Sequence, residues 1–299
     1  MKHNKRKILG WSILLMISLI TSGCGQKNKT SAVEQVVTET TPIIVQNEDF
    51  LVIFINAGKA DAALVQVENK DYLIDTGKKE SVDAIKAALE SQEVTQLDGV
   101  FLTHTHGDHI GGLKKLSKVY PIQKVYSAEI SMNDTNGTNR IDSLVTELGL
   151  NQTKLVASDK VQITDQVAFE VLGPITYDPN DDNDNSLVLR LSINNKVFLF
   201  AGDMQFAEEK SLLFDGVDLK ADVLKVGNHG NPDATSADFA RAVSPEIAVI
   251  STDTSVKKNS ASKRVQELFQ ESQLYLTQDF NLGIKITISE EGKLVVSNP

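Results

Sequence analysis

The sequence predicts a layered α/β domain, and three features of its pattern support this prediction. Short apolar runs of strand length recur from residue 50 to the C-terminal region. Segments with helical spacing of apolar residues lie between these runs along the whole chain. Hydrophobic residues make up 41% of the 299 residues, which is enough to bury a sizeable core. We therefore expect strands and helices packed in layers, not separate all-α and all-β pieces.

The predicted strands are short and mostly apolar, beginning with the continuous run at residues 50–55. They comprise residues 50–55, 62–67, 72–74, 100–102, 167–172, 186–193, 196–200, 223–226, 247–251 and 283–288. The predicted helices comprise residues 81–91, 110–117, 140–148, 207–213, 236–242 and 260–270. In the first helix, Val82, Ile85 and Leu89 share one face. The polar residues 178–184 are predicted to form a loop, either simply solvated or able to bind a surface cation weakly.

The N-terminal 24 residues resemble the export signal of a bacterial lipoprotein. A basic segment at residues 2–7 precedes an apolar run of 13 residues, which is too short for an ordinary membrane span. Small residues then precede Cys24, and in lipoprotein signals that cysteine receives lipid. An uncleaved signal anchor, with Cys24 as an incidental thiol, is the alternative interpretation.

These features predict three parts of the chain. We expect a signal peptide over residues 1–23, lipidated Cys24 and a polar, flexible tether over residues 24–46, and the folded α/β domain over residues 47–299. A short strand at residues 43–45 is an alternative within the tether. Cys24 is the only cysteine in the sequence, which excludes disulfides within the chain. The predicted location is outside the cytoplasm, anchored to the bacterial cell membrane.

The charge of the chain bears on its partners. The formal net charge is −10, and residues 1–23 contain four basic residues and no acidic one, so the remainder carries −14. A surface of this sign repels phosphate backbones at long range. Tight, non-specific binding of nucleic acid is therefore disfavoured.

The most informative segment contains three of the five histidines within six residues. Since a strand places residues i and i+2 on one face, His104 and His106 are expected to point the same way. Gly107 is expected to let the backbone turn, so that Asp108 and His109 face the same volume. Three imidazoles and a carboxylate suit Zn²⁺, with Mn²⁺ or Fe as alternatives. A polar turn with chance histidines is disfavoured by this spacing in a histidine-poor chain.

These residues match the H-x-H-x-D-H motif of the metallo-β-lactamase superfamily, which the chain resembles over roughly residues 50–290. The resemblance is greatest to the hydrolase domain of ComEC-type competence proteins. In that branch the segments read approximately D-V-G-Q-G-D, I-D-T-G, H-x-x-x-D-H-x-G-G, S-L-V-L-R-L, T-G-D and K-V-G-H-H-G-S. The corresponding stretches here are residues 56–61, 74–77, 104–112, 186–191, 201–203 and 225–231.

The resemblance implies a single-domain αββα sandwich with one or two zinc ions held by loops at one edge of the sheets. The implied metal ligands are His104 and His106 for the first ion, Asp108, His109 and His229 for the second, and Asp203 as a bridge. Asp108 is implied to be a ligand first and a proton carrier second. Asp75 either orients a ligand histidine or satisfies a local turn. Further residues expected beside the ligands or the substrate are Asp61, Lys59, Asn185 and Asn228.

The chain departs from the superfamily pattern at the first metal site. A third histidine usually lies between the histidine cluster and the late aspartate, but no histidine stands between His109 and His229. The first site is therefore expected to be poor in ligands, and the residues that could lie there are Asn183, Asp184 and Asn185. Asn228 replaces the first histidine of a pair, and Lys59 stands where glutamine is common.

The function expected from these residues is metal-dependent hydrolysis by a metal-bound hydroxide, with a small-molecule or surface-polymer phosphodiester as the substrate. Lys59 and Lys225 could meet phosphate, although lysines are more often solvated at the surface. Two alternatives stay open. One is a binding protein that kept the fold and lost catalysis, and the other is a hydrolase of another ester or amide class. The sequence does not determine the oligomeric state.

Overall fold

Two β-sheets form the centre of the fold in a computed structural model that describes residues 50–133 and 136–299. The first sheet has the spatial order β15 (Leu294–Ser297), β14 (Gly283–Ile288), β1 (Phe50–Ile55), β2 (Ala63–Val67), β3 (Lys70–Ile74), β4 (Gly99–Leu102), β5 (Val125–Ala128) and β6 (Gln152–Leu155). The second has the order β13 (Gln273–Leu276), β12 (Ile247–Ile250), β11 (Val223–Lys225), β10 (Lys196–Phe200), β9 (Val188–Ile193), β8 (Ala168–Gly173) and β7 (Lys160–Gln162). The predicted signal peptide, Cys24, the tether and the alternative strand at residues 43–45 lie outside the described residues.

The two sheets face each other across an apolar core. Phe54 on β1 packs against Phe200 on β10, and Phe101 on β4 packs against Phe169 on β8, with ring centroids 5.8 Å and 4.6 Å apart. Alternate residues of β1, including Ile53, point to the opposite face and join a second core. Burial on both faces explains why β1 is a continuous apolar run and not an alternating one.

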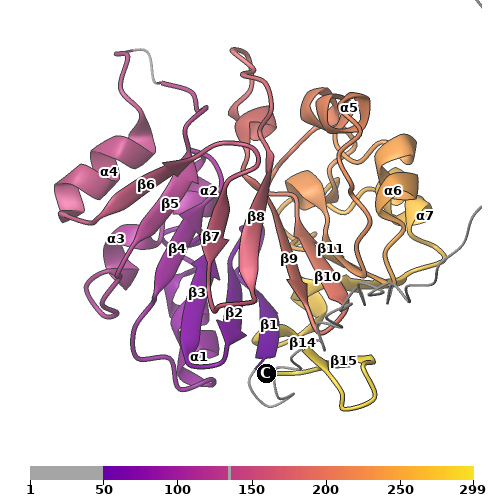
Figure 1. The fold of residues 1–299 in the computed structure, drawn as a ribbon, viewed down its shortest axis with the longest axis horizontal. Helices are drawn as coiled ribbons and strands as arrows, with labels where there is room; N and C mark the ends of the chain where they lie inside the picture. Colours follow the sequence, from indigo (N-terminus) through magenta and orange to yellow (C-terminus); the bar gives the residue numbers. More distant parts are fainter. Residues whose placement is uncertain (1–49, 134–135) are drawn as a thin grey trace, which may run out of the picture. The chain divides into compact units, whose positions relative to one another are not determined.

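Helices cover the outer face of each sheet (Figure 1). The first sheet is covered by α1 (Val82–Glu90), α3 (Leu113–Leu116) and α4 (Arg140–Leu148), whose apolar residues belong to one core with those of β3 and β4. The second sheet is covered by α5 (Phe206–Phe214), α6 (Ala237–Val243) and α7 (Lys263–Leu268). The expected αββα sandwich is confirmed.

Side chains that cap the helices explain where two of them begin. Asn139 accepts hydrogen bonds from the backbone N–H groups of Ile141 and Asp142 at the start of α4, and Gly149 ends this helix with a left-handed φ of 64°. Ser236 accepts a hydrogen bond from the Phe239 N–H at the start of α6.

Several elements differ from the prediction. The helix expected over residues 110–117 is two short helices, α2 (Gly107–Ile110) and α3, separated by Gly111 and Gly112, which pack closely against backbone. A Cβ atom at Gly112 would lie 2.0 Å from the carbonyl oxygen of Thr76. The helix expected over residues 260–270 is shorter, and the expected loop at residues 178–184 runs into the 3₁₀ helix η2 (Asp182–Asn185). Other short 3₁₀ helices are η3 (Gly227–Gly230) and η4 (Thr277–Asp279).

The strand directions bring several loops to one edge. β3 and β4 are parallel in the first sheet, and β10, β11 and β12 are parallel in the second. Loops at the carboxyl ends of parallel strands are the usual place for ligand sites in such sheets. Within the described ranges, no helix combines the length and the apolar character needed to cross a membrane.

The core between the sheets gives the first testable prediction. Phe169 is fully buried against Phe101 and Tyr72, so Phe169→Ala should lower the free energy of unfolding by about 3–5 kcal/mol through lost burial and the cavity left behind. Phe214 is 88% exposed, and Phe214→Ala should change it by less than about 0.5 kcal/mol. Urea unfolding measures both values, and losses of equal size would contradict the assigned core.

Candidate metal centre

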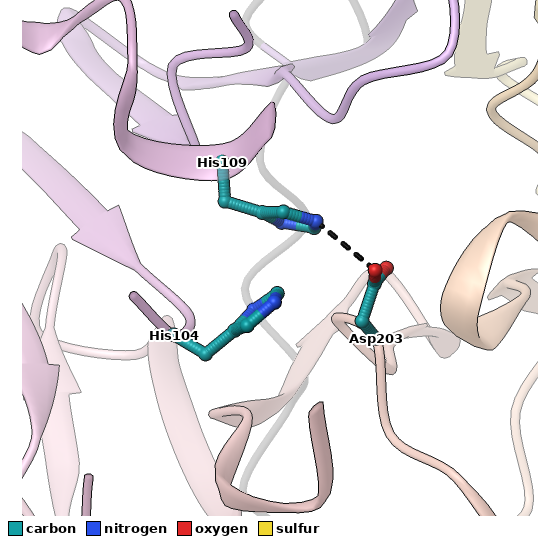
Figure 2. A group of neighbouring side chains, drawn as sticks. All are labelled: His104, His109 and Asp203. Carbon is teal, nitrogen blue, oxygen red and sulfur yellow. Dashed lines mark ion pairs between the residues drawn. The ribbon is translucent and has the colours of Figure 1, made fainter. Parts of the chain in front are cut away.

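Acidic and histidine side chains gather at one edge of the fold, where the carboxyl ends of strands from both sheets meet. His104 and His109 follow β4, Asp203 follows β10, His229 follows β11, and Asp75 follows β3. Figure 2 shows His104 and His109 turned toward Asp203, so side chains from the two sheets face a common volume. Residues far apart in the sequence therefore converge at the edge that the strand directions favour.

One group matches the ligands expected for the second metal. The Nε2 atom of His109 lies 3.2 Å from an Asp203 carboxylate oxygen, and Nε2 of His229 lies 3.4 Å from the same oxygen and 3.6 Å from Asp108. Asp108, His109 and His229 converge as one possible ligand group. Both Nε2 atoms and the Asp203 Oδ1 atom are buried without a hydrogen-bond partner among the described residues. Nitrogen and carboxylate donors left free at one point fit a divalent metal.

The group expected for the first metal is less complete. His104, His109 and Asp203 converge, but His106 belongs to none of the possible ligand groups among the described residues. Its Nδ1 atom lies 3.0 Å from His104 Nε2, with the ring centroids 4.6 Å apart. The two rings are neighbours as expected, although β4 ends at Leu102 and strand alternation is not the reason. The turn comes from the extended conformation of His106 and not from Gly107, which is the first residue of α2.

Asp75 holds His109 in place. One Asp75 oxygen lies 2.7 Å from His109 Nδ1, and the carboxylate also accepts hydrogen bonds from the N–H and the hydroxyl of Thr103, both at 2.8 Å. Partners on the ring nitrogen that faces away from a metal fix the tautomer and the orientation of a ligand histidine. The geometry thus favours the orienting interpretation of Asp75 over the local-turn interpretation.

The loop after β11 presents His229 in a restrained conformation. Asn228 and His229 have left-handed φ values of 45° and 53°, which are costly for residues with a Cβ atom. Backbone hydrogen bonds from Asn228 to Gly202 and from Ala261 to His229 hold this turn. The Nδ1 atom of His229 donates to the Ser251 carbonyl at 2.9 Å, which leaves Nε2 facing the centre.

Asp61 and Lys225 form a buried ion pair behind the histidines. Lys225 is only 4% exposed, and its ammonium group also donates to the Gly202 carbonyl at 2.9 Å and lies 3.8 Å from Asp203. Burial alone would lower the pKa of Lys225, but Asp61 and Asp203 raise it above its ordinary value. The expectation that Lys225 could meet phosphate is therefore wrong, because its charge is satisfied inside the protein.

The other residues expected near the ligands differ in position. Lys59 donates to an Asp108 oxygen at 3.1 Å and lies at the edge of the centre. The Asn228 amide bonds to Asn231 and Asp233. Asn185 makes three hydrogen bonds within the segment from Asp178 to Asn185 itself. Ser186 directly follows this segment, and its hydroxyl lies beside His104, 3.3 Å from Nδ1.

The electric field of the centre favours cations. Burial alone would lower the pKa of His109, but the carboxylates of Asp203 and Asp75 raise it well above its ordinary value. Asp203 raises the pKa of His229 against burial in the same way. For His104, burial and the neighbouring His109 outweigh the effect of Asp203 and lower its pKa well below its ordinary value. The acidic groups are therefore concentrated around His109 and His229, the stronger half of the centre.

Sequence reasoning missed Asp182, which braces the histidine segment. Its Oδ2 atom accepts hydrogen bonds from the N–H and the hydroxyl of Thr105, at 2.8 Å and 2.6 Å. Thr105 lies between His104 and His106, so Asp182 fixes the backbone that carries both rings. The buried Asp182 stands in an acidic stretch that looked solvated, and its contacts with Thr105 and Met132, 77 and 50 residues away, distinguish it.

Comparison with known proteins agrees with the fold and the motifs. The family model described as the Metallo-beta-lactamase superfamily matches residues 55–254. "ComE operon protein 3" of Bacillus subtilis (strain 168) is 29% identical over 182 residues, which is 61% of this chain and 23% of that protein. "Competence protein ComA" of Neisseria gonorrhoeae is 30% identical over 211 residues, which is 70% of this chain and 28% of that protein. The expected likeness to ComEC-type competence proteins is confirmed.

The similarities cover only part of the competence relatives, and the likeness to solved structures concerns the fold. The chain spans about a quarter of the length of the competence relatives. Among solved structures, the metallo-beta-lactamase fold protein YhfI of Bacillus subtilis superposes with a TM-score of 0.53 at 12% identity, covering 83% of this chain and 100% of YhfI. At that identity the likeness describes the fold alone.

The role of Asp182 gives the second testable prediction. Asp182→Ala removes the acceptor of both Thr105 hydrogen bonds, so it should lower the Zn²⁺ affinity by about 10–100-fold through misplacement of the histidines. Competition with a chromophoric chelator measures the affinity, and circular dichroism checks folding. Asp165→Asn changes an exposed acid and should leave the affinity unchanged. A folded Asp182→Ala protein with unchanged affinity would refute the bracing role.

Proposed function

The chain belongs to the metallo-beta-lactamase superfamily of metal-dependent hydrolases, and on this basis we propose that it is a phosphodiesterase that acts at the bacterial cell surface. The observation that carries the proposal is the buried set of His109, Asp203 and His229, in which both Nε2 atoms and the Asp203 Oδ1 atom have no hydrogen-bond partner among the described residues. Leaving such atoms unpaired inside a protein is costly unless a ligand satisfies them. A protein that had lost its metal would be under no constraint to keep them.

The residues of the centre take distinct roles in this proposal. Divalent metals, when bound, supply hydroxide near neutral pH and stabilise the charge that develops on the substrate. Asp203 can join two metals because its carboxylate has two oxygens, and Asp108, His109 and His229 complete the second site. We propose Zn²⁺ because imidazole nitrogens predominate among the donors. Asp75 keeps the Nδ1 proton of His109 engaged, so that Nε2 is available to the metal.

Lys59 supports a phosphoester as the substrate. Its ammonium group lies at the edge of the centre beside Asp108, with 14% of the side chain exposed. A cation there can contact a non-bridging phosphate oxygen that approaches the metals. Lys225 is buried in its pair with Asp61, whereas Lys59 keeps part of its side chain exposed, so Lys59 is the lysine of the two that is placed to carry this role. The acidic chain favours a small molecule or a surface polymer over nucleic acid.

The proposed location rests on the N-terminal sequence. The basic segment, the short apolar run and the small residues before Cys24 support export and lipid attachment. The tether through residue 46 would then hold the domain outside the membrane. Metabolic labelling with a clickable fatty acid tests this, since Cys24→Ala should abolish the label.

A second candidate function is a binding protein without catalysis. The observation in its favour is the incomplete first site: among the described residues His106 joins no converging group, and the sequence has no histidine between His109 and His229. Elemental analysis of the purified protein separates the two candidates. Less than about 0.1 metal ion per chain, with no loss of thermal stability in chelator, would favour the binding protein.

Hydrolysis of bis-p-nitrophenyl phosphate gives the third testable prediction. Residues 25–299 should release p-nitrophenol with Zn²⁺ or Mn²⁺, and Asp203→Asn should lower kcat by about 100-fold or more because the bridging carboxylate is lost. Asp238→Asn, at an exposed acid on α6, is the matched control and should be as active as the natural sequence. Absence of activity in every metal, with metal demonstrably bound, would rule out the phosphodiesterase.

The role of Lys59 gives the fourth testable prediction. Lys59→Gln should raise KM for bis-p-nitrophenyl phosphate about tenfold, because one charge-assisted contact to phosphate is lost. KM for the uncharged ester p-nitrophenyl acetate, if it is hydrolysed, should not change. Lys263→Gln alters a lysine with a 92% exposed side chain and serves as the control. Equal effects on both substrates would assign Lys59 to the support of Asp108 instead.

A further inference from the structure

A groove lies between α2 and α4, next to the segment that carries the metal-binding histidines. It has a volume of about 390 Å³, which is within the range of sites that bind small molecules. Ile110 and Leu144 contribute apolar surface to its lining, and Arg140 and Ser143 contribute polar groups from the first turn of α4. Since Ile110 directly follows His109, the groove begins one residue beyond a proposed metal ligand.

Arg140, the first residue of α4, reaches the histidine segment. A Cβ atom at Gly107 would lie 4.0 Å from the Nη2 atom of the Arg140 guanidinium. Gly107 stands between His106 and Asp108, and all three of these residues are partly exposed. This is therefore the side of the metal centre that a substrate can approach, and the guanidinium lies beside it.

The charge of Arg140 is not compensated by the described residues, none of which forms an ion pair with its guanidinium or accepts a hydrogen bond from it. The two acids of α4 are paired elsewhere, Asp142 with Lys154 and Glu147 with Lys114. In a chain with a net charge of −10, a cation left unpaired beside the reaction centre is suited to hold an anion. The other described arginines each have a protein partner, namely Arg190, Arg241 and Arg264.

We propose that the groove selects substrates that carry a second anionic group, and that Arg140 binds this group. The inference rests on the proposed phosphodiesterase and narrows its substrate class to a phosphodiester that also carries a phosphate or a carboxylate. A guanidinium suits either group, because its parallel N–H groups can contact two oxygen atoms at once. Ile110 and Leu144 would contact the apolar part of the substrate between the two anionic groups.

Lys59 and Arg140 would hold different parts of such a substrate. Lys59 lies beside Asp108, where the reacting phosphate approaches, and Arg140 lies beside Gly107, on the side of the groove. Beyond α2 and its adjoining residues, Nη2 of Arg140 is the only described atom within 4 Å of a Cβ position at Gly107. This leaves room for a substrate group next to the guanidinium. A substrate with one anionic group would engage Lys59 alone, so it should bind more weakly.

Binding of nucleotide probes to the full-length, Zn²⁺-loaded protein tests the inference. Thymidine 3′,5′-bisphosphate carries a phosphate that thymidine 5′-monophosphate lacks, so its Kd, measured by calorimetry, should be lower by about tenfold or more. Thymidine 5′-monophosphate with a 3′-O-succinyl group has a carboxylate in place of the added phosphate, and the comparison shows which anion the groove prefers. A gain from either group supports the proposal. Kd values within about twofold for all three probes would overturn it.

Variants locate the gain in affinity. Arg140→Gln should abolish it, whereas Arg140→Lys keeps the charge without the paired N–H groups and should retain part of it. Arg241→Gln, at an exposed arginine of α6, is the matched control and should retain all of it. Circular dichroism and zinc content check that each variant is folded and loaded. Persistence of the gain in Arg140→Gln, or equal weakening of all probes, would overturn the role of Arg140.

Hydrolysis separates this inference from the proposed function. A gain in affinity that depends on Arg140, without cleavage of bis-p-nitrophenyl phosphate by the metal-loaded protein, would refute the phosphodiesterase and support the anion site. Cleavage of bis-p-nitrophenyl phosphate without any gain from the second anionic group would support the phosphodiesterase and overturn the assignment of the groove.

Discussion

Repulsion among four carboxylates confined to one buried edge constrains the metal centre. Asp61, Asp75, Asp108 and Asp203 each converge with His109 or His229, and like charges in a medium that excludes water cannot remain uncompensated. Lys225 forms an ion pair with Asp61, and Asp75 accepts hydrogen bonds from Thr103 and His109. Asp203 and Asp108 face the histidines, with Lys225 3.8 Å from Asp203 and Lys59 3.1 Å from Asp108. The excess negative charge is thereby directed to the point where the ring nitrogens converge, which is the arrangement that a divalent cation satisfies.

Much of this fold follows from local pattern, because a strand buried on both faces must be apolar throughout. The runs that became β1, β4, β10 and β12 were recognisable for that reason, and so were the helices whose inner faces they pack against. The missed strands were β5, β6, β7, β13 and β15. These are three or four residues long and several lie at sheet edges, where one face meets solvent and the sequence carries polar residues such as Gln152 and Lys154. Their strand conformation comes from pairing with a neighbour, which no local pattern records.

The metal centre was predictable in its composition but not in all its contacts. The spacing from His104 to His109 and the motifs around Asp203 and His229 indicated the converging groups. Lys225 was misjudged because its partner Asp61 comes from a turn 164 residues away, which the local sequence does not show. Asp182 was overlooked because a run of acids and amides is typical of a solvated loop. In both cases the decisive information is a long-range pairing of charges and donors that depends on how the two sheets face each other.

Because the ligands come from both sheets, the geometry of the centre depends on the fixed relation between those sheets. His104 and His109 belong to the first sheet and Asp203 and His229 to the second, so a small shift of one sheet alters every distance across the centre. Two parts of the structure oppose such a shift. The apolar core between the sheets resists it through dense packing, and η2 links the segments after β4 and β10 through Asp182 and Asp184. A substitution in either part should therefore act on metal binding as well as on stability, even where it touches no ligand.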